Sequence, residues 1–518
     1  MEFLLGFFEA AVLTCCCLIG GWRLMHYFQL ESYQLPGYVR SVKRNAQRTL
    51  IPCVCFAAVG VVPLVLGAPG ALRLALLALF GALIAQRTRK EKLKKPFVLT
   101  ERVKRLIAIH AASTFAVAAV SLILFPKVIA YLLPAFEAGL LMLAAVIAAP
   151  IEKNINNQFL NDAKARLEAR PELIKIGITG SYGKTSTKFL LRDILSVKYS
   201  VLATPSSFNT PMGVTRVIRE QLTGSHQVFI AEMGARHVGD IKELVNLVHP
   251  SIGLITSVGP QHLDTFGTIE RIKNTKYELM EGLPRDGKAI FARDGAICEE
   301  LYARCPLEAK YMPGDLFEAS GIEAGPWGTR FTLTDRETGE SVRCQTRLLG
   351  EHSISNLLLC CTAARLLGMT LPEIALGVAR CQPVEHRLEL LDGGASGVSI
   401  IDDAFNSNPV GARAALRVLE HFPGRRIIIT PGMVELGGEE AAFNRSFGEQ
   451  MARSVDVAIL VGKKHTQPIV EGLLEKGFPQ ENIHVVSDLD ESTKVLHAMM
   501  KAGDVVLYEN DLPDNYSE

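Results

Sequence analysis

The chain has 518 residues, of which 48% are hydrophobic, and its formal net charge at pH 7 is +1. This length allows two to four domains. The near-zero charge argues against a polyanionic partner, and no nucleic-acid-binding module is visible. The eleven cysteines form no CxxC pair, as is typical of small apolar residues in a reducing compartment.

The hydrophobic residues are concentrated before residue 151. Five apolar segments follow one another there, at about 4–22, 50–66, 71–85, 106–124 and 128–149. Most have the ~20-residue length of a membrane-crossing helix, although the third is shorter, so four spans is the nearest alternative. Buried core helices are the other explanation, but several in succession without a polar face would leave little surface for water. We therefore predict an α-helical transmembrane region of about five helices in residues 1–151.

The charges between these segments predict their orientation. The loops 23–48 and 87–105 are rich in Lys and Arg, whereas the connections 67–70 and 125–127 carry almost no charge. Basic loops stay on the cytoplasmic side, so five passes leave everything after residue 151 in the cytoplasm. Met1-Glu2-Phe3 has no basic n-region, which disfavours a signal peptide. The predicted location is therefore the cytoplasmic membrane, with multiple passes, and the basic loops could also attract anionic lipid.

The remainder of the chain has the pattern of an α/β protein. A polar helical connector is expected over 152–171, and after it short apolar runs alternate with helical patterns, which predicts largely parallel sheets. These roughly 365 residues exceed one comfortable core, and a second α/β series begins near residue 385. We predict two domains here, at 152–384 and 385–518.

The segment 173–187, LIKIGITGSYGKTST, joins a strand pattern to a helical pattern through a glycine-rich loop. In such a loop, backbone N–H groups and the positive end of the next helix face a phosphate, a lysine adds charge, and a hydroxyl can hold magnesium. A chance GxxGKT in an ordinary turn is the alternative, but the position between strand and helix favours a nucleoside triphosphate site. The predicted ATP-binding residues are Gly180, Ser181, Tyr182, Gly183, Lys184, Thr185 and Ser186.

Three residues outside the loop are candidates for the same site. Glu232 ends the apolar run VFIA, at the sheet edge where open α/β folds bind ligands, and its carboxylate could reach a magnesium ion. His262 follows ITSVGPQ and could bind a cation or a phosphate, although a structural turn histidine is the commoner case. Lys276, in NTKYELMEGL, would by itself be a solvated helix residue.

Together these segments resemble the Mur ligase family, most closely its members that add D-alanyl-D-alanine to the peptidoglycan tripeptide precursor. The matching motifs lie in order over about residues 174–462: GITGSYGKTST, SSFNTPMGV, IAEMGARHVGDI, LITSVGPQHLDTFGTIERIKNTKYELMEGL, GEHSISN, VEHRLE, IDDAFNSNP and PGMVELG. The resemblance implies a central P-loop ATPase domain and a C-terminal Rossmann-like domain that closes over it. It also implies that ATP phosphorylates a carboxylate and that an amine attacks the acyl phosphate, forming an amide bond.

The resemblance assigns roles to individual residues. Lys184 and its loop would hold the phosphates, Thr185 and Glu232 would bind one magnesium ion, and His262 would bind a second. Lys276 falls on the family's carbamylated lysine, which as an anion would organise the second metal. The predicted catalytic residues are therefore Lys184, Lys276 and His262.

Further matches concern the two substrates. Asn209, in SSFNTPMG, matches the position that lines the acyl substrate. The residues matched to nucleotide contacts are Asp294, Arg387, Asp402 and Asn406. The alternative for the last two is an Asx turn that Asp402, Asn406 and Asn408 build before Pro409. His352 and Asn356, in GEHSISN, could be either helix-capping or functional residues.

The chain departs from the family at several positions. The usual first domain, which binds a UDP-sugar, is absent, and the membrane region stands in its place, so the acyl substrate stays open. Ser257 replaces the usual Asn before VGP, Asp294 follows Ala-Arg rather than Asn-x, and Gly432 replaces an acidic residue. The family's Lys-Gly-Ser near the C-terminus becomes YENDLPDN at 508–515. That segment could select a cationic amine, but we expect a solvated tail.

The predicted function is a membrane-anchored, ATP- and Mg²⁺-dependent ligase in peptidoglycan-precursor synthesis. It would join a carboxylate on a small-molecule or lipid-linked envelope precursor to the amine of an amino acid or peptide. A poly-γ-glutamate-synthase-like polymer ligase is the alternative among enzymes, and a UDP-MurNAc-tripeptide ligase requires a partner to supply the sugar site. A transporter or sensor gated by the ATPase should carry ionisable residues inside its spans. Few are present, and Glu9, Arg73 and Glu137 are expected near the interfaces.

Overall fold

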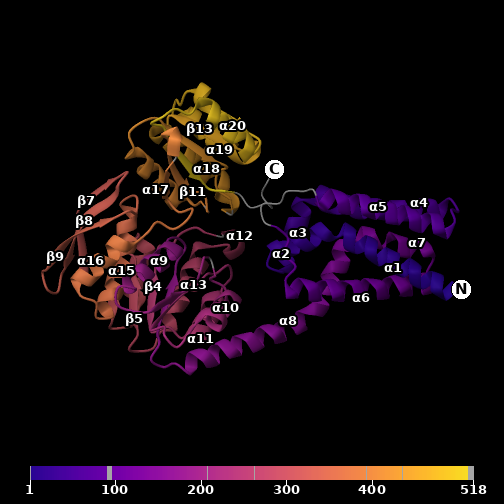
Figure 1. Ribbon diagram of the computed structural model, residues 1–518, viewed down its shortest axis with the longest axis horizontal. Coiled ribbons are helices and arrows are strands. Elements are labelled where there is room, and N and C mark those ends of the chain that lie inside the picture. Colours follow the sequence, from indigo (N-terminus) through magenta and orange to yellow (C-terminus); the bar gives the residue numbers. More distant parts are fainter. Residues whose placement is uncertain are drawn as a thin grey trace. The chain divides into compact units, whose positions relative to one another are not determined.

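The computed structural model of the protein describes residues 2–89, 96–206, 208–261, 263–392, 394–405, 407–434 and 436–511. These residues form two compact units, the first ending at Gln158 and the second beginning at Phe159. Figure 1 labels many of the helices and strands of both units.

The first unit consists of helices in its described part. By length and composition, four helices could cross a membrane: Ala46–Val65, Gly70–Thr88, Glu101–Leu124 and Lys127–Glu168. A fifth candidate is the pair Leu5–Gly20 and Trp22–Leu30, which is bent by 47°. Both counts considered from the sequence, five and four, are thus within the range that these helices allow. The bounds are α1 (Glu2–Gly20), α2 (Trp22–Leu30), α3 (Leu35–Arg44), α4 (Ala46–Val65), α5 (Gly70–Arg89), α6 (Glu101–Leu124), α7 (Lys127–Leu132), η1 (Leu133–Phe136) and α8 (Glu137–Glu168).

Ionisable side chains are paired inside this helical unit. His110 Nε2 lies 2.6 Å from Glu137 Oε1, and each of these side chains is only 1% exposed. Glu9 is fully buried and forms ion pairs with Lys127 at 3.0 Å and with Arg73 at 3.4 Å. The sequence analysis predicts Glu9, Arg73 and Glu137 near the membrane interfaces and does not include His110. In the structure Glu137 faces the interior, where pairing lowers the cost of burying a charge.

The second unit starts with a parallel six-stranded sheet in the order β2-β3-β1-β4-β5-β6. Successive residues of β3 enter different cores: Val228 and Ile230 pack with the helices on one face, and Phe229 and Ala231 with those on the other. This alternation is the two-residue period of a strand covered on both faces. The bounds are β1 (Ile174–Thr179), α9 (Lys184–Leu195), β2 (Val201–Ala203), α10 (Pro211–Gln221), β3 (Val228–Glu232), α11 (Asp240–Val248), β4 (Ile252–Ile255), α12 (Leu263–Phe266), α13 (Ile269–Glu281), β5 (Lys288–Phe291), α14 (Ala296–Arg304) and β6 (Lys310–Tyr311).

A small antiparallel sheet follows, in the order β7-β8-β9. Strand β7 packs beside α15 and strand β9 beside α16 (Figure 1). Helix α16 begins with a capping box between Thr370 and Glu373 and has Pro372 in its first turn. The bounds are β7 (Phe317–Gly325), β8 (Gly328–Asp335), β9 (Ser341–Thr346), α15 (His352–Leu366) and α16 (Leu371–Arg380).

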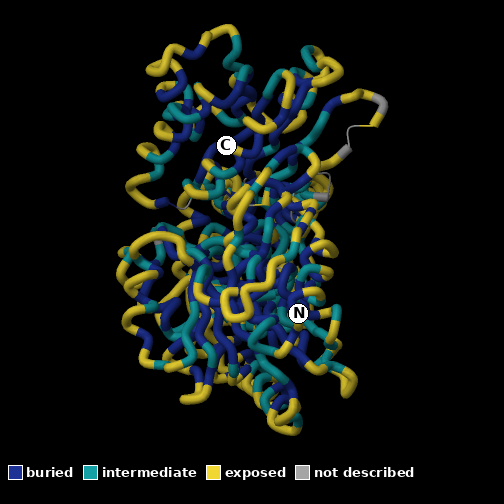
Figure 2. Tube along the Cα trace, turned by 90° about the vertical axis from the view of Figure 1, so that its left-hand side faces the viewer, coloured by how far each residue is buried: buried dark blue, intermediate teal, exposed yellow. Residues whose placement is uncertain are grey.

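The second α/β series forms another six-stranded sheet, in the order β10-β11-β15-β12-β13-β14. Only β10 is antiparallel to its neighbour among these described strands. Figure 2 shows buried residues inside and exposed residues along the outer turns. The bounds are β10 (Glu389–Asp392), η2 (Gly394–Ser396), β11 (Ser399–Asp403), α17 (Pro409–Glu420), β12 (Arg426–Thr430), η3 (Gly437–Glu439), α18 (Glu440–Ser454), β13 (Val457–Val461), α19 (Lys463–Glu475), η4 (Gln480–Asn482), β14 (Ile483–Val486), α20 (Leu489–Met499) and β15 (Val505–Glu509).

Candidate functional site

The glycine-rich loop between β1 and α9 has the conformation that a phosphate cradle requires. Gly180 and Gly183 have φ angles of +150° and +78°, in the region that favours glycine, and a Cβ at Gly180 would collide with Thr256 Oγ1. Ser181 fixes the loop, because its backbone N–H donates to Ser257 O at 2.6 Å and its hydroxyl to Gly259 O at 2.9 Å. No side chain caps the start of α9. The first N–H groups of this helix are therefore available to an anion.

Lys184, the first residue of α9, folds back over the loop. Its Nζ donates to Gly180 O at 2.7 Å and to Ser181 O at 3.0 Å. Burial lowers the pKa of Lys184 to about 8, although the nearby carboxylate of Glu232 opposes that shift. The lysine is therefore held at the position where a phosphate would lie against the loop.

Glu232 is the centre of a buried polar cluster beside the loop. It lies at the carboxyl end of β3 next to the end of β1, because Ile178 and Glu232 are partners in the parallel register. Its Oε1 accepts hydrogen bonds from Thr185 Oγ1 at 3.1 Å and from Asn209 Nδ2 at 3.0 Å. The sequence motifs that contain Thr185, Asn209 and Glu232 thus meet at one carboxylate.

Lys188 completes this cluster and was missed in the sequence. Its Nζ lies 2.9 Å from Glu232 Oε2, with side chains only 0% and 1% exposed. Burial would raise the pKa of Glu232, but the ammonium groups of Lys188 and Lys184 outweigh burial and lower it. The sequence did contain a sign that Lys188 is buried: it lies one turn after Lys184, on the helix face that also carries the buried Leu191.

Lys276 is buried on α13 and not solvated, with 2% of its surface exposed. Burial, followed by the like charge of Lys184, lowers its pKa well below the usual value. Within the described part of the chain, its ammonium makes no hydrogen bond or ion pair. His262, predicted to act beside Lys276, lies outside the described residues. The structure thus buries Lys276 within reach of the charge of Lys184 at the loop.

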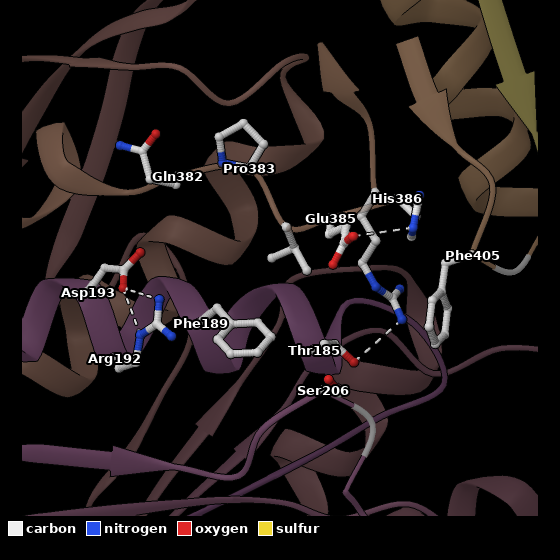
Figure 3. Close-up of a pocket in the computed structure, with 12 residues that line it drawn as sticks. Thr185, Phe189, Arg192, Asp193, Ser206, Gln382, Pro383, Glu385, His386 and Phe405 are labelled. Carbon is white, nitrogen blue, oxygen red and sulfur yellow. Dashed lines mark hydrogen bonds and ion pairs between the residues drawn. The ribbon is translucent and has the colours of Figure 1, made fainter. Parts of the chain in front are cut away.

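Arg387 approaches the loop from the second α/β series. Its Nη2 donates to Thr185 Oγ1 at 3.5 Å, and its guanidinium lies 4.4 Å from the ring centroid of Phe405. Figure 3 shows Thr185 and Phe189 on α9 and Phe405 opposite them, around a cleft of about 270 Å³. This cleft is one of two that meet at Arg387.

The other cleft has a volume of about 230 Å³ and contains several predicted residues. Asn356 lies against the loop, where its Oδ1 accepts a hydrogen bond from Thr187 Oγ1 at 3.3 Å. Burial lowers the pKa of His352, also on this lining, to about 4. Neither residue caps the start of α15. The lining includes Tyr182, Gly183, Ser186, Asp294, His352, Asn356, Arg387, Asp403, Ser407 and Glu509.

Asp402 lies on the lining of neither cleft. Its Oδ2 is 2.7 Å from His386 Nδ1, and its Oδ1 accepts the Ala404 N–H at 3.1 Å. Its neighbour Asp403 lines the second cleft, and burial raises the pKa of Asp403 to about 7 against the effect of Arg387. Asn408 caps α17, as the Asx alternative predicts, and Asn406 lies outside the described residues.

The expectation of a solvated tail from residue 508 is wrong for the first residues of that segment. Tyr508 and Glu509 end β15, which pairs with β11 and β12 in the middle of the sheet. Glu509 is 1% exposed, and its carboxylate accepts hydrogen bonds from the hydroxyl of Ser407 and, at 2.9 Å, from Thr430 Oγ1. Burial raises the pKa of Glu509 to about 8. Residues 512–515 lie outside the described residues.

The oxygen atoms of Thr185 and Glu232 fit a magnesium ion that also binds a nucleotide. Hard divalent cations prefer oxygen ligands, and magnesium is commonly bound through one or two protein groups plus phosphates. No group of three or more His, Cys, Asp and Glu side chains that could hold a metal occurs in the described ranges. A hydroxyl and one carboxylate at 3.1 Å agree with that mode of binding.

The sheet order, phosphate loop and strand-end carboxylate define the class of nucleotide-using α/β enzymes. Family comparison gives the narrower assignment: residues 178–364 match the Mur ligase middle domain, and residues 386–508 match the Mur ligase glutamate ligase domain. The chain belongs to the Mur ligase family, and it is an ATP-dependent ligase that forms amide bonds. Neither matched range includes the first unit.

Individual relatives agree with this assignment. The UDP-N-acetylmuramoyl-tripeptide–D-alanyl-D-alanine ligase of Mycobacterium bovis is 32% identical over 364 residues, which are 64% of this chain and 69% of the relative. The enzyme of the same name from Bacillus subtilis is 27% identical over 339 residues, covering 64% of this chain and 72% of the relative.

Solved structures show the same fold. MurF from Acinetobacter baumannii has a TM-score of 0.62 and 24% identity, with 70% of this chain and 78% of that chain covered. MurF ligase from Thermotoga maritima, in complex with ADP, has a TM-score of 0.60 and 24% identity, covering 69% and 80%. At this identity the likeness supports the fold alone.

Proposed function

We propose that the chain is a membrane-anchored Mur ligase that joins a carboxylate on a cell-envelope precursor to the amine of an amino acid or peptide. The observation that carries this proposal is the meeting of Lys184, Thr185, Glu232 and Arg387 at the phosphate loop, with Lys276 buried nearby. A carboxylate is a poor electrophile, so it is first phosphorylated by ATP, and the amine then displaces phosphate from the acyl phosphate. Positioning and charge neutralisation supply most of that catalysis.

The loop and its neighbours bind the phosphates. Lys184 and the loop N–H groups contact them, and Thr185 with Glu232 would hold Mg²⁺, which supplies charge neutralisation when bound. Lys188 keeps Glu232 ionised before the cation arrives, because their ion pair lowers the pKa of the carboxyl. Arg387 reaches Thr185 and adds positive charge at the same place.

Lys276 is proposed to carry a carbamate. A buried lysine without an ion-pair partner in the described structure, and with a strongly lowered pKa, presents the neutral amine that reacts with carbon dioxide. The resulting anion would be stabilised by the positive charge of Lys184. His262 and this carbamate are the proposed ligands of a second magnesium ion.

The remaining residues are proposed to bind substrates. Asn209 would line the acyl substrate. Its hydrogen bond to Glu232 would hold the acyl-substrate side of the site next to the proposed phosphate and Mg²⁺ position. Asp294 and Arg387, which share a cleft with Tyr182 and Gly183, would contact the nucleotide. Asn406 is proposed to do so after closure, and Asp402 would act through its bond to His386, next to Arg387. Closure would also keep water from the acyl phosphate.

The first unit is proposed to be a transmembrane region in the cytoplasmic membrane. Four long apolar helices and one bent pair support about five spans. The exposed basic residues Arg40, Lys43 and Arg44 of α3 support a cytoplasmic position for the loop 23–48. We propose 1–151, 152–384 and 385–518 as the transmembrane, ATP-binding and C-terminal regions, with the last two in the cytoplasm.

The relatives' names guide the proposed substrates. Those enzymes are named for a UDP-N-acetylmuramoyl-tripeptide and D-alanyl-D-alanine, so we propose an envelope precursor as the acyl donor and an amino acid or dipeptide as the amine. The donor is a small or lipid-linked molecule. A polymer ligase that extends a poly-γ-glutamate-like chain is the alternative use of the same chemistry.

Acceptor dependence tests this proposal. Purified full-length protein with ATP and Mg²⁺ should release phosphate only when a carboxylate donor and an amine are both present. Lys184→Ala should reduce turnover about 10³-fold, the scale for losing a group that stabilises transition-state charge. Lys276→Ala should also reduce it, with partial recovery on adding a short carboxylate such as acetate, while Lys242→Ala on exposed α11 surface serves as the control.

Phosphate release without any acceptor, unaffected by Lys276→Ala, would contradict the ligase. That outcome would favour a transporter or sensor, for which the buried His110–Glu137 pair is the supporting observation.

A further inference from the structure

A cavity of about 350 Å³ lies in the first unit. Its walls come from three parts of the chain: the segment from the end of α2 to the start of α3, the start of α6, and the middle of α8. The volume falls in the ~300–1000 Å³ range of small-molecule sites. No residue of the phosphate-loop site contributes to it, so it is a separate candidate site.

The walls of the cavity are mostly apolar. Ala145, Ala148 and Ala149 lie at positions i, i+3 and i+4 of α8, so they share one helix face. Phe28 and Leu106, which are 3% and 4% exposed, line it from α2 and α6. The space exists because three small side chains face two large ones. An occupant must therefore be hydrocarbon over much of its length.

One end of the cavity is polar, and its charge is positive. Arg105 takes both oxygens of Glu152, with Nε at 2.7 Å from Oε1 and Nη2 at 2.9 Å from Oε2. Arg102 reaches the same carboxylate only at 3.8 Å. Within the described residues it makes no shorter polar contact, and its side chain is 38% exposed. Two arginines thus share one carboxylate, and the N–H groups of Arg102 are left for an anion.

Arg102 is nevertheless held in place. Its guanidinium lies 3.9 Å from the ring centroid of Tyr33. Tyr33 and the preceding Ser32 have φ angles of +63° and +53°, a conformation that side chains other than glycine rarely adopt. The Tyr33 N–H donates to Phe28 O at 2.8 Å, which fixes this turn. Strained backbone of this kind is often found at ligand sites, and here it positions the ring that orients Arg102.

The surroundings of the cavity are those of a membrane boundary. Trp22, at the start of α2, packs edge-on against Phe97, which shortly precedes α6, with ring centroids 4.5 Å apart. Helix α3 exposes Arg40, Lys43 and Arg44 and buries Tyr38 and Val42. Aromatic rings and basic side chains gather at the cytoplasmic membrane surface, at the depth of the lipid phosphates.

We propose that this cavity binds one inner-leaflet lipid that carries a phosphate head group. Arg102 would donate to the phosphate oxygens, which match a guanidinium well, and the alanine face of α8 would contact the start of the hydrocarbon chain. The inference rests on the proposed membrane location of the first unit. A lipid-linked acyl donor has this chemistry.

Lipid retention by the full-length protein tests the inference. Detergent-solubilised protein is incubated with dioleoyl phosphatidate or with dioleoylglycerol, which has the same chains without phosphate, and bound lipid is counted by native mass spectrometry. Arg102→Gln should weaken phosphatidate binding about tenfold, the scale of one hydrogen bond to a charged group. Arg40→Gln removes an equal charge from the exposed face of α3 and should leave binding unchanged.

A second variant addresses the apolar wall. Ala149→Leu fills part of the cavity while keeping both Arg102 and Glu152 and should reduce retention of phosphatidate, whereas Ala112→Leu on the exposed side of α6 should not. If Arg102→Gln fails to fold, Ala149→Leu decides alone. Equal retention of dioleoylglycerol, or equal loss in the two control variants, would overturn the inference.

Two further measurements separate this inference from the proposed function. ATP should stabilise each variant against heat as it does the parent protein, so lost lipid binding with intact ATP protection concerns the cavity alone. Extraction of the protein from membranes by alkaline carbonate would instead contradict the membrane location itself.

Discussion

Two buried glutamates occupy matching places in the two large sheets, but their neighbours differ. Glu232 ends β3 and Glu509 ends β15, and each is 1% exposed. Lys188 lies 2.9 Å from Glu232, whereas the described partners of Glu509 are the hydroxyls of Ser407 and Thr430. Burial would raise the pKa of both; the lysines lower it for Glu232, while that of Glu509 rises to about 8.

The comparison shows that the position of a carboxyl group in the fold does not determine its charge. At pH 7 Glu232 is ionised and suited to a cation. Glu509 is mostly protonated and can donate a hydrogen bond, although it stands at the same kind of strand end. The second sheet therefore presents a mostly neutral carboxyl group to a cleft, whereas the anionic carboxylate of Glu232 lies in the buried cluster beside the loop.

The largest expected effect is that of Lys188→Ala. Removing Lys188 leaves the buried charge of Glu232 without its ion-pair partner, a change that typically costs about 3–5 kcal/mol. We expect the melting temperature of the full-length protein to fall by several degrees, measured by scanning fluorimetry. Adding Glu232→Gln removes the charge and should recover part of the loss, and a double variant no more stable than Lys188→Ala would contradict this account.

A smaller, pH-dependent effect is expected for Glu509→Gln. The folded-state pKa of Glu509 is raised, so its contribution to stability is full below the unfolded pKa and is lost as pH rises through about 8. Gln imitates the protonated form at every pH. The melting temperature of the variant should therefore equal that of the parent near pH 5 and exceed it at pH 8.5.

Asp403 should contribute to the same pH dependence of stability. Its pKa is also raised, to about 7, and it pairs in register with Glu509. Asp403→Asn should remove a part of the same pH dependence. A parent protein whose melting temperature rises from pH 5 to 8.5, with Glu509→Gln following it in parallel, would contradict a protonated Glu509.

The local parts of the site could be predicted from the sequence. The loop, its glycines and the start of α9 are one continuous segment whose geometry depends on neighbouring residues. Thr185 and Glu232 could be predicted as site residues because the loop of Thr185 follows a recognisable strand and Glu232 ends another. Lys188 was missed because its partner Glu232 is 44 residues away in the sequence. The two residues meet because β1 and β3 pair in a particular register, which neither strand sequence alone predicts.

The errors near the C-terminus have a similar cause. YEND has the composition of a tail, but Tyr508 is half-buried and Glu509 is buried, because β11 and β12 enclose their strand. Adjacent strand residues point to opposite faces, and so Asp403 lines a cleft while the predicted Asp402 does not. His110 and Glu137 are distant in sequence, and their pairing needed the helix packing to be known.

The smallest expected effect is that of Asp402→Asn, a third strand-end carboxyl group that is paired at a more exposed position. His386 is 49% exposed, and its hydrogen bond to Asp402 raises its pKa. Such pairs contribute about 0–1 kcal/mol. A raised histidine pKa gives stability that is present at low pH and lost as pH rises through the folded pKa. The variant should therefore melt slightly below the parent at pH 5.5 and equally at pH 8.5, with ATP protecting both alike. A deficit that persists at pH 8.5 together with weaker ATP protection would instead mean that Asp402 contacts the nucleotide directly, because a nucleotide contact does not depend on the protonation of His386.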